Sequence, residues 1–203
     1  MLRTAVFVSG GGTNLQAILN EKSAGNIPHT EIVLVLASND QAYALQRAAK
    51  AGITGVVVKK NPSESGESYG KRLLEVLEEN QIDLIVLAGF LTILPANVIH
   101  AYDHRILNIH PSLIPSFCGK GYYGLRVHEA ALQRGVKITG ATVHYVNEIP
   151  DGGDIIAQKA VNVWEGDTPE TLQKRVMEEA EWILLPQAIE EVARRITEGE
   201  HNK

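Results

Sequence analysis

The residues best suited to chemistry in this sequence are an asparagine and a histidine two positions apart, Asn108 and His110. They close an apolar run, residues 105–109, that predicts a β-strand. Residues i and i+2 of a strand share a face, so both side chains are expected to point the same way. An amide donor beside an imidazole can stabilise an oxyanion and move a proton. A polar strand end held by hydrogen bonds is the alternative, but the rigid segment 111–115 that follows favours the functional interpretation.

A carboxylate that could serve this pair is Asp151, which precedes two glycines. Asp-Gly is common in ordinary turns, so the motif alone does not indicate function. A carboxylate near an imidazole orients the ring and favours its charged form. The loop could therefore bring Asp151 toward His110, or it could be a plain turn.

A third feature is the glycine-rich turn Ser9-Gly10-Gly11-Gly12-Thr13-Asn14, which joins a short apolar run to a helical pattern. Glycines let a ligand approach the backbone, and the N–H groups of the following helix make an anion site. After Gly10 and Gly12, Leu15 occupies the position of the third glycine in a dinucleotide fingerprint, and no Gly-Lys-Ser/Thr follows. The turn thus favours a monophosphate ligand over NAD or ATP, with a tight turn that only needs positive φ as the alternative.

The elements that must position these residues alternate along the first half of the chain. β-branched runs near residues 4–8, 32–37, 54–58 and 83–88 are separated by helical patterns near residues 13–22, 41–51 and 67–80. This alternation predicts βαβ units and a parallel sheet.

The pattern changes after residue 105. A Pro/Gly-rich segment over residues 110–124 precedes a predicted helix at 125–134 and a hairpin-like pair of strands at 138–146 and 154–163. Pro169 marks the start of a last helix that is predicted to run to about Glu198, with a break near Pro186 and a frayed tail over residues 198–203.

Composition excludes several classes. The chain has 203 residues, a formal net charge of -5 and one cysteine, Cys118. One cysteine permits neither an internal disulfide nor a cysteine-rich zinc site, and no His, Asp or Glu spacing indicates another metal. The acidic balance argues against nucleic acid as the main partner. The longest apolar stretch, residues 84–99, is interrupted by polar residues and falls short of a membrane span. We therefore expect a single cytoplasmic domain.

Taken together, the motifs resemble those of the phosphoribosylglycinamide formyltransferases, the folate-dependent GAR transformylases of purine biosynthesis. The resemblance covers nearly the whole chain, and its most specific part is an Asn-Ile-His-Pro-Ser-Leu-Leu-Pro motif in which this chain has Ile114 at the second leucine. The matching segments are residues 9–16, 87–90, 108–115, 139–144 and 151–153.

The resemblance implies a Rossmann-like three-layer α/β fold with a mostly parallel central sheet that becomes mixed toward the C-terminal half. It implies one domain over residues 1–203, with a phosphate-binding half to about residue 100 and a catalytic and folate-binding half after it. The implied reaction is direct transfer of formyl from 10-formyltetrahydrofolate to the amine of glycinamide ribonucleotide, without a metal. These two compounds are the implied partners of a monomer or homodimer.

The family roles transfer to individual residues. Asn108 and a protonated His110 would donate hydrogen bonds to the oxyanion, and Asp151 would keep His110 charged. Gly12, Thr13 and Asn14 would hold the phosphate, and Glu181 would contact the glycinamide end. The expected folate contacts, largely through backbone, are Leu91, Thr92, Ile93, Leu94, Asn108, Asn147, Glu148, Ile149, Pro150 and Asp151.

Some features depart from the family or stay open. Thr92 stands where members often have arginine, and the segment 116–124 looks longer than usual, so it is either a flap with Lys120 near an anion or a solvated loop. His144 is either a ligand contact or a core histidine, and Cys118 is a weak candidate for a covalent nucleophile.

Three other functions use parts of the same pattern. A methionyl-tRNA formyltransferase is expected to add a nucleic-acid-binding domain, and a formyltetrahydrofolate hydrolase to add an N-terminal regulatory domain. A nucleotide-binding module would not require Asn108, His110 and Asp151 together.

Overall fold

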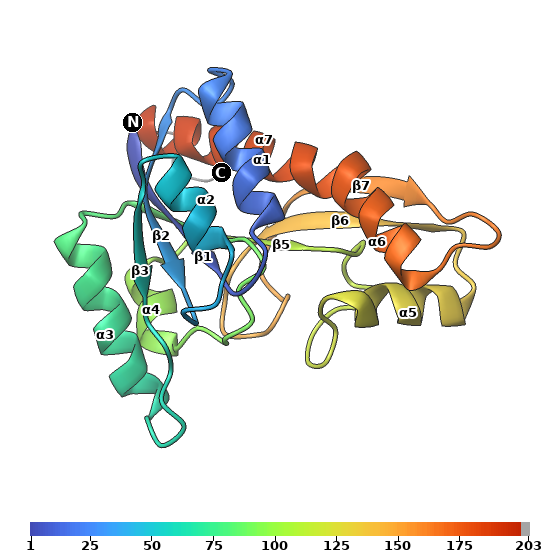
Figure 1. Ribbon diagram of the computed structural model, residues 1–203, viewed down its shortest axis with the longest axis horizontal. Helices are drawn as coiled ribbons and strands as arrows, with labels where there is room; N and C mark the ends of the chain where they lie inside the picture. The colour runs from blue at the N-terminus through green and yellow to red at the C-terminus, as the bar shows by residue number, and fades with distance from the viewer. Residues whose placement is uncertain (200–203) are drawn as a thin grey trace.

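The computed structural model describes residues 1–199, and the end of the predicted frayed tail, residues 200–203, lies outside them. Its centre is one seven-stranded sheet in the order β3-β2-β1-β4-β5-β6-β7 (Figure 1). Strands β1 to β5 pair in parallel, whereas β5–β6 and β6–β7 are antiparallel. This confirms the predicted α/β fold with a mostly parallel sheet that becomes mixed. The strands are β1 (Leu2–Val8), β2 (Thr30–Ala37), β3 (Thr54–Val57), β4 (Leu84–Leu87), β5 (Ile106–His110), β6 (Ile138–Tyr145) and β7 (Ile155–Asn162).

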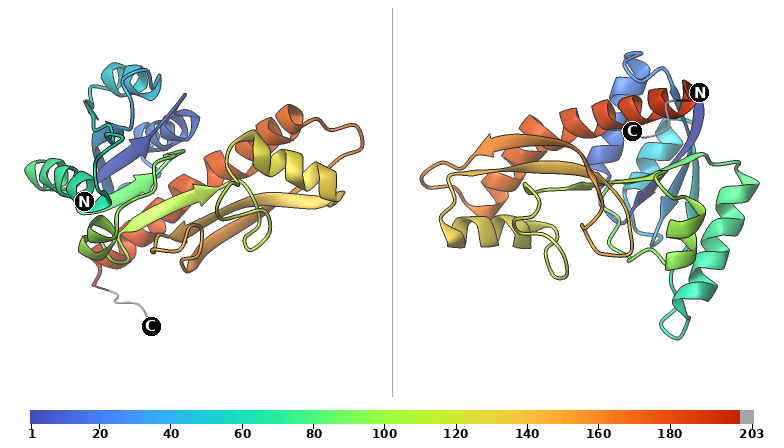
Figure 2. Two further views of the ribbon diagram at one scale, coloured as in Figure 1. Left: turned by 90° about the horizontal axis from the view of Figure 1, so that it is seen from below. Right: turned by 180° about the vertical axis from the view of Figure 1, so that it is seen from behind.

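Helices cover both faces of the sheet, as Figure 2 shows. On one face of the parallel part, α1 and α7 pack in one hydrophobic cluster, and α3 and α4 pack in a second cluster on the other face. The helices are α1 (Thr13–Ser23), α2 (Ala44–Lys50), α3 (Gly66–Glu79), α4 (Ala96–Ala101), α5 (Leu125–Arg134), α6 (Pro169–Val176), the π-helix η1 (Met177–Glu181) and α7 (Trp182–Thr197). Among the described residues, no helix is long and apolar enough to span a membrane.

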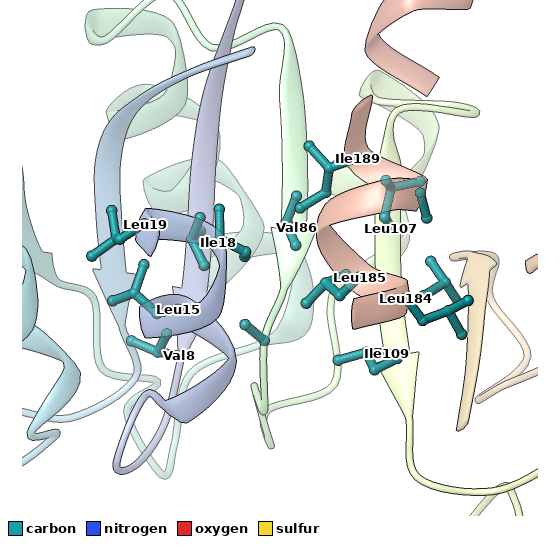
Figure 3. Close-up of a cluster of buried hydrophobic side chains, with 14 of the residues drawn as sticks. Val8, Leu15, Ile18, Leu19, Val86, Leu107, Ile109, Leu184, Leu185 and Ile189 are labelled. Atoms are coloured by element: carbon teal, nitrogen blue, oxygen red, sulfur yellow. The ribbon is translucent and has the colours of Figure 1, made fainter. Parts of the chain in front are cut away.

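Side chains of α1 and α7 anchor these helices on the strands that carry the polar residues. Figure 3 shows Leu15, Ile18 and Leu19 of α1 in the same cluster as Val86 of β4. The α7 residues Leu184, Leu185 and Ile189 lie in this cluster with β5 residues Leu107 and Ile109, and all of these side chains are buried. The core thereby fixes the first turn of α1, the end of β5 and the start of α7 relative to one another.

The last helix differs from its prediction. It begins as predicted, with Pro169 in its first turn and a capping box between Thr168 and Thr171. The predicted break at Pro186 is wrong, because α7 runs through this buried proline. Proline has no N–H, so it cannot donate to the carbonyl four residues earlier. That carbonyl belongs to Trp182, the first residue of α7 after the π-helix. The irregularity therefore falls one turn before the proline.

Candidate active site

Asn108, His110 and Asp151 converge at the carboxyl end of β5. Asn108 Nδ2 lies 3.5 Å from Asp151 Oδ1, and His110 Nδ1 lies 3.6 Å from Asp151 Oδ2. The two β5 side chains thus point to the same carboxylate, as their spacing predicted. Asp151 itself has a φ of 55°, a left-handed conformation that aspartate tolerates better than most residues. The loop after β6 therefore holds Asp151 at the site rather than forming a simple turn.

His144 also belongs to this cluster. It lies opposite Asn108 in the antiparallel β5–β6 ladder, and its Nε2 is 3.0 Å from Asn108 Nδ2. Its Nδ1 is 2.8 Å from the carbonyl of Tyr145, which can only accept, so Nδ1 carries a proton. In the neutral ring Nε2 then accepts from Asn108. The sequence leaves the role of His144 open. The register of the β5–β6 pair, which places His144 opposite Asn108, is the feature that brings it to the site.

The surroundings of His110 favour its neutral form. Its Nε2 donates to the carbonyl of Phe117 at 2.9 Å, which leaves Nδ1 of the neutral ring without a proton. Burial lowers the pKa of His110, and this effect outweighs the opposing attraction of the Asp151 carboxylate. The lowered pKa runs against the expectation that Asp151 keeps His110 protonated, because desolvation disfavours the imidazolium more than Asp151, at 3.6 Å, favours it.

Asp151 is held as the carboxylate. Burial by itself would raise its pKa, but the His144 and His110 rings in their protonated forms and the backbone N–H of Gly119 together lower the pKa below its ordinary value. The Gly119 N–H donates to Oδ2 at 2.7 Å. The site thus pairs a fixed negative charge with a neutral imidazole that can take up a proton.

A second polar cluster lies at the start of α1. Asn14 Nδ2 donates to Glu181 Oε2 at 2.6 Å, and both side chains are buried. Burial raises the pKa of Glu181, and the Asn14 hydrogen bond opposes that shift. Asn14 Oδ1 is buried without a partner among the described residues. The cluster therefore presents an acceptor that a bound ligand can satisfy.

Two cavities adjoin these residues, and the larger one connects the Asn14–Glu181 cluster with the Asn108–His110–Asp151 cluster. The larger, of about 550 Å³, is lined by Thr13, Asn14 and Glu181 at one end and by Asn108, His110 and Asp151. The smaller, of about 140 Å³, is lined by all ten residues predicted to contact folate, together with His144. Asn108 and Asp151 line both. The structure therefore brings the sequence-predicted residues together, with one exception.

The exception is Gly12, which lines neither cavity. Its φ is 70°, and a Cβ added to it would lie 2.6 Å from Cβ of Ala44. Gly12 therefore shapes the turn by allowing α2 to approach, and the residues that follow it present their N–H groups at the start of α1.

The segment 116–124 is tied to the site by Phe117 and Gly119, through the two bonds given above. Tyr122 and Tyr123 line the larger cavity, whereas Lys120 is exposed. Cys118 donates to the carbonyl of Pro115 at 3.3 Å, and burial, followed by the charge of Asp151, raises its thiol pKa. A raised pKa disfavours the thiolate, so Cys118 is not activated as a nucleophile. Within residues 1–199, no group of three or more His, Cys, Asp or Glu side chains could hold a metal ion.

Comparison with known proteins agrees with this geometry. A family model described as formyl transferase matches residues 2–189. The chain is 41% identical over 178 residues to the chloroplastic phosphoribosylglycinamide formyltransferase of Arabidopsis thaliana, a match that covers 87% of this chain and 61% of that protein. It is 39% identical over 202 residues to the trifunctional purine biosynthetic protein adenosine-3 of Homo sapiens, covering 99% of this chain but 19% of that protein. The chain thus spans less than two thirds of these relatives.

Two solved structures match over nearly their whole length. Glycinamide ribonucleotide transformylase 1 from Symbiobacterium toebii is 40% identical with a TM-score of 0.89, and the match covers 96% of this chain and 88% of that one. Phosphoribosylglycinamide formyltransferase from Bacillus halodurans is 37% identical with a TM-score of 0.87, with 96% of each chain covered. The chain therefore belongs to the formyl transferase family, among the phosphoribosylglycinamide formyltransferases.

Proposed function

We propose that this chain transfers the formyl group of 10-formyltetrahydrofolate to the amine of glycinamide ribonucleotide. The observation that carries the proposal is the position of Asn108 and Asp151, which line both cavities, with His110 beside them in the larger one. A phosphate-bearing acceptor in the larger cavity and a folate in the smaller one would meet at these three side chains. The names of the two solved relatives, a glycinamide ribonucleotide transformylase and a phosphoribosylglycinamide formyltransferase, agree with the acceptor and the transferred group.

The far end of the larger cavity suits the ribonucleotide. The first N–H groups of α1 suit a phosphate, because helix N-termini attract anions. Deeper in, the unpartnered Asn14 Oδ1 and the Glu181 carboxyl are acceptors for hydroxyl and amine donors. Thr13 and Asn14 are therefore assigned to the phosphate end and Glu181 to the glycinamide end, with Gly12 as the residue that shapes the turn.

The smaller cavity suits the folate. Its rim contains the exposed apolar side chains of Leu91, Ile93 and Ile149, which can cover a flat aromatic ring system. The loops 91–94 and 147–151 add backbone donors and acceptors along the same wall. This arrangement supports 10-formyltetrahydrofolate as the co-substrate and makes the side chain at Thr92 secondary.

The chemistry follows from the protonation states. The substrate amine attacks the formyl carbon, and the carbonyl oxygen becomes an oxyanion that accepts a hydrogen bond from an Asn108 N–H. This N–H is available because its contact with Asp151, at 3.5 Å, is a weak hydrogen bond. Nδ1 of neutral His110 takes the amine proton, and the Asp151 carboxylate stabilises the resulting imidazolium. His110 then returns the proton to the folate nitrogen as the carbon–nitrogen bond breaks and tetrahydrofolate leaves.

The expected magnitudes are substantial. One oxyanion donor contributes about 2.7–4 kcal/mol to the transition state. Acid–base assistance from His110 contributes roughly 10²–10⁴-fold in rate. Alignment of both substrates contributes up to about 7–11 kcal/mol, so the two binding ends matter at least as much as the catalytic side chains.

The test is a spectrophotometric assay that follows release of the deformylated folate with and without glycinamide ribonucleotide. Signal that requires the ribonucleotide supports the proposal. Signal without it identifies water as the acceptor and a hydrolase instead. No signal in either tube means another amine acceptor or a protein that only binds, and contradicts the proposal.

The proposal also includes the setting of the enzyme. We infer a single domain over residues 1–203, acting as a monomer or homodimer without nucleic acid. Its single cysteine favours a reducing compartment such as the cytoplasm.

A further inference from the structure

Arg47 of α2 is anchored against the glycine-rich turn. Its Nε donates to the carbonyl of Gly11 at 2.8 Å, and Nη1 donates to Gln16 Oε1 at 2.9 Å. The guanidinium carbon lies 5.1 Å from the centroid of the Tyr43 ring, within the range of a cation–π contact. Three contacts therefore fix the orientation of a half-buried cation beside the turn.

The backbone of α2 holds the same turn. The Ala44 N–H donates to the carbonyl of Gly10 at 3.2 Å, and Gly12 packs so closely on Ala44 that it has no room for a Cβ. The carbonyls of Gly10 and Gly11 are thus both bonded to α2. Carbonyl oxygens repel anions. Because these two carbonyls are bonded to α2, the N–H groups at the start of α1 are the groups that face the proposed phosphate site.

Arg47 also shares a wall with the proposed phosphate site. Arg47 and Thr13 line one hollow of about 380 Å³, together with Gln16 and Trp182. Thr13 lines the larger cavity as well, and the described lining of that cavity contains no lysine or arginine. Arg47 is therefore a cation on the same surface as Thr13, the first residue of α1.

We propose that Arg47 is a positioning residue for the phosphate of the acceptor substrate. It fixes the glycine-rich turn through Gly11 and places a positive charge on the same surface as Thr13, so that the N–H groups at the start of α1 stay presented to the phosphate. This inference rests on the proposed function for the identity of the substrate. Its binding part concerns a phosphate group alone and can be measured without turnover.

The test compares Arg47→Met, which keeps length but removes charge and donors, with Arg47→Lys, which keeps the charge. Arg194→Met is the matched control, because Arg194, like Arg47, is a helix arginine with hydrogen-bonded donors, here to Glu198, and does not line the two cavities. Two experiments are made. Thermal-shift titration gives the dissociation constant of inorganic phosphate, and steady-state kinetics gives kcat and the KM for each substrate.

We expect Arg47→Met to raise the phosphate dissociation constant and the KM for the ribonucleotide about tenfold, because the nearby positive charge and the charge-assisted hydrogen bond that fixes Gly11 are both lost. The kcat and the KM for the formyl folate should stay within about twofold, since those quantities do not involve the phosphate. Arg47→Lys should recover part of the loss, and Arg194→Met should match the wild type.

Unchanged phosphate binding and ribonucleotide KM in Arg47→Met would overturn the inference. Equal losses for both substrates, with a lowered melting temperature, would also overturn it, because they indicate a purely structural role. If the wild type shows no ribonucleotide-dependent activity, the proposed function fails, while the phosphate titration still decides the role of Arg47.

Discussion

Replacing Glu181 by glutamine should stabilise the protein while impairing its function. Glu181 is only 7% exposed, and within residues 1–199 its carboxyl has one hydrogen-bond partner, Asn14. Burial raises the carboxyl pKa, so ionisation of Glu181 costs the folded state free energy. Glutamine keeps an oxygen for the Asn14 N–H and adds an N–H that can donate to the unpartnered Asn14 Oδ1.

The size of the effect follows from the cost of an uncompensated buried polar group, roughly 1–3 kcal/mol in protein mutations. For a chain of about this length, 1 kcal/mol shifts the melting temperature by roughly 2–4 °C. We therefore expect Glu181→Gln to melt a few degrees above the wild type at pH 8.

The pH dependence has a definite sign. A carboxyl whose folded pKa is raised binds its proton more tightly in the native state, so its contribution to stability falls as pH rises above the unfolded pKa. The advantage of Glu181→Gln should therefore be small at pH 5, grow with pH, and level off once the folded pKa is passed.

The assay is thermal unfolding at pH 5 to 8, with Glu179→Gln as control because Glu179 is exposed on the same π-helix. The same variant should lose about tenfold or more in kcat/KM for the ribonucleotide, since a charged acceptor at the glycinamide end is gone. A Glu181→Gln melting temperature at or below the wild type at pH 8, or a difference independent of pH, would refute the reasoning.

Three further predictions concern the site. The kcat/KM should fall at acidic pH as His110 becomes protonated. Asp151→Asn should move this acid limb of the pH profile to lower pH, because the Asp151 carboxylate raises the His110 pKa. A limb that moves to higher pH would contradict the assigned charges. Gly12→Ala should cost about 1–3 kcal/mol and raise the ribonucleotide KM, since Ala44 leaves no room for a Cβ; chemical denaturation and kinetics measure both, and wild-type values would show that the turn adapts. His144→Phe should lower kcat about tenfold with little change in either KM, because Asn108 loses the acceptor that orients its amide; an unchanged kcat would make His144 a core residue only.

Much of the fold was predictable because each strand has a strong local pattern. The buried run of β4 and the parallel units before it follow from apolar residues that both sheet faces require. Helix α4 was missed, because Ala96–Ala101 continues an apolar stretch and carries no amphipathic pattern of its own. The π-helix was missed because it depends on how α7 packs and on Pro186, rather than on a local signal.

The site was predictable where spacing alone decides geometry. The two-residue spacing places Asn108 and His110 on one face, whereas the approach of Asp151 depended on a loop and was supported by resemblance. His144 enters through strand register, and the charge of His110 depends on burial and on the carbonyl of Phe117, seven residues away. Neither of these tertiary features is encoded in the spacing of the sequence motif.

The central claim is that the reaction takes place where the two cavities meet, at Asn108 and Asp151, with the adjacent His110 as the group that accepts the proton. The most direct measurement is the turnover of His110→Ala with both substrates saturating, alongside its melting temperature and its affinity for each substrate. We predict that kcat falls at least about 10²-fold while folding and both affinities are retained. A fall of only a few-fold in a folded protein that still binds both substrates would contradict the account.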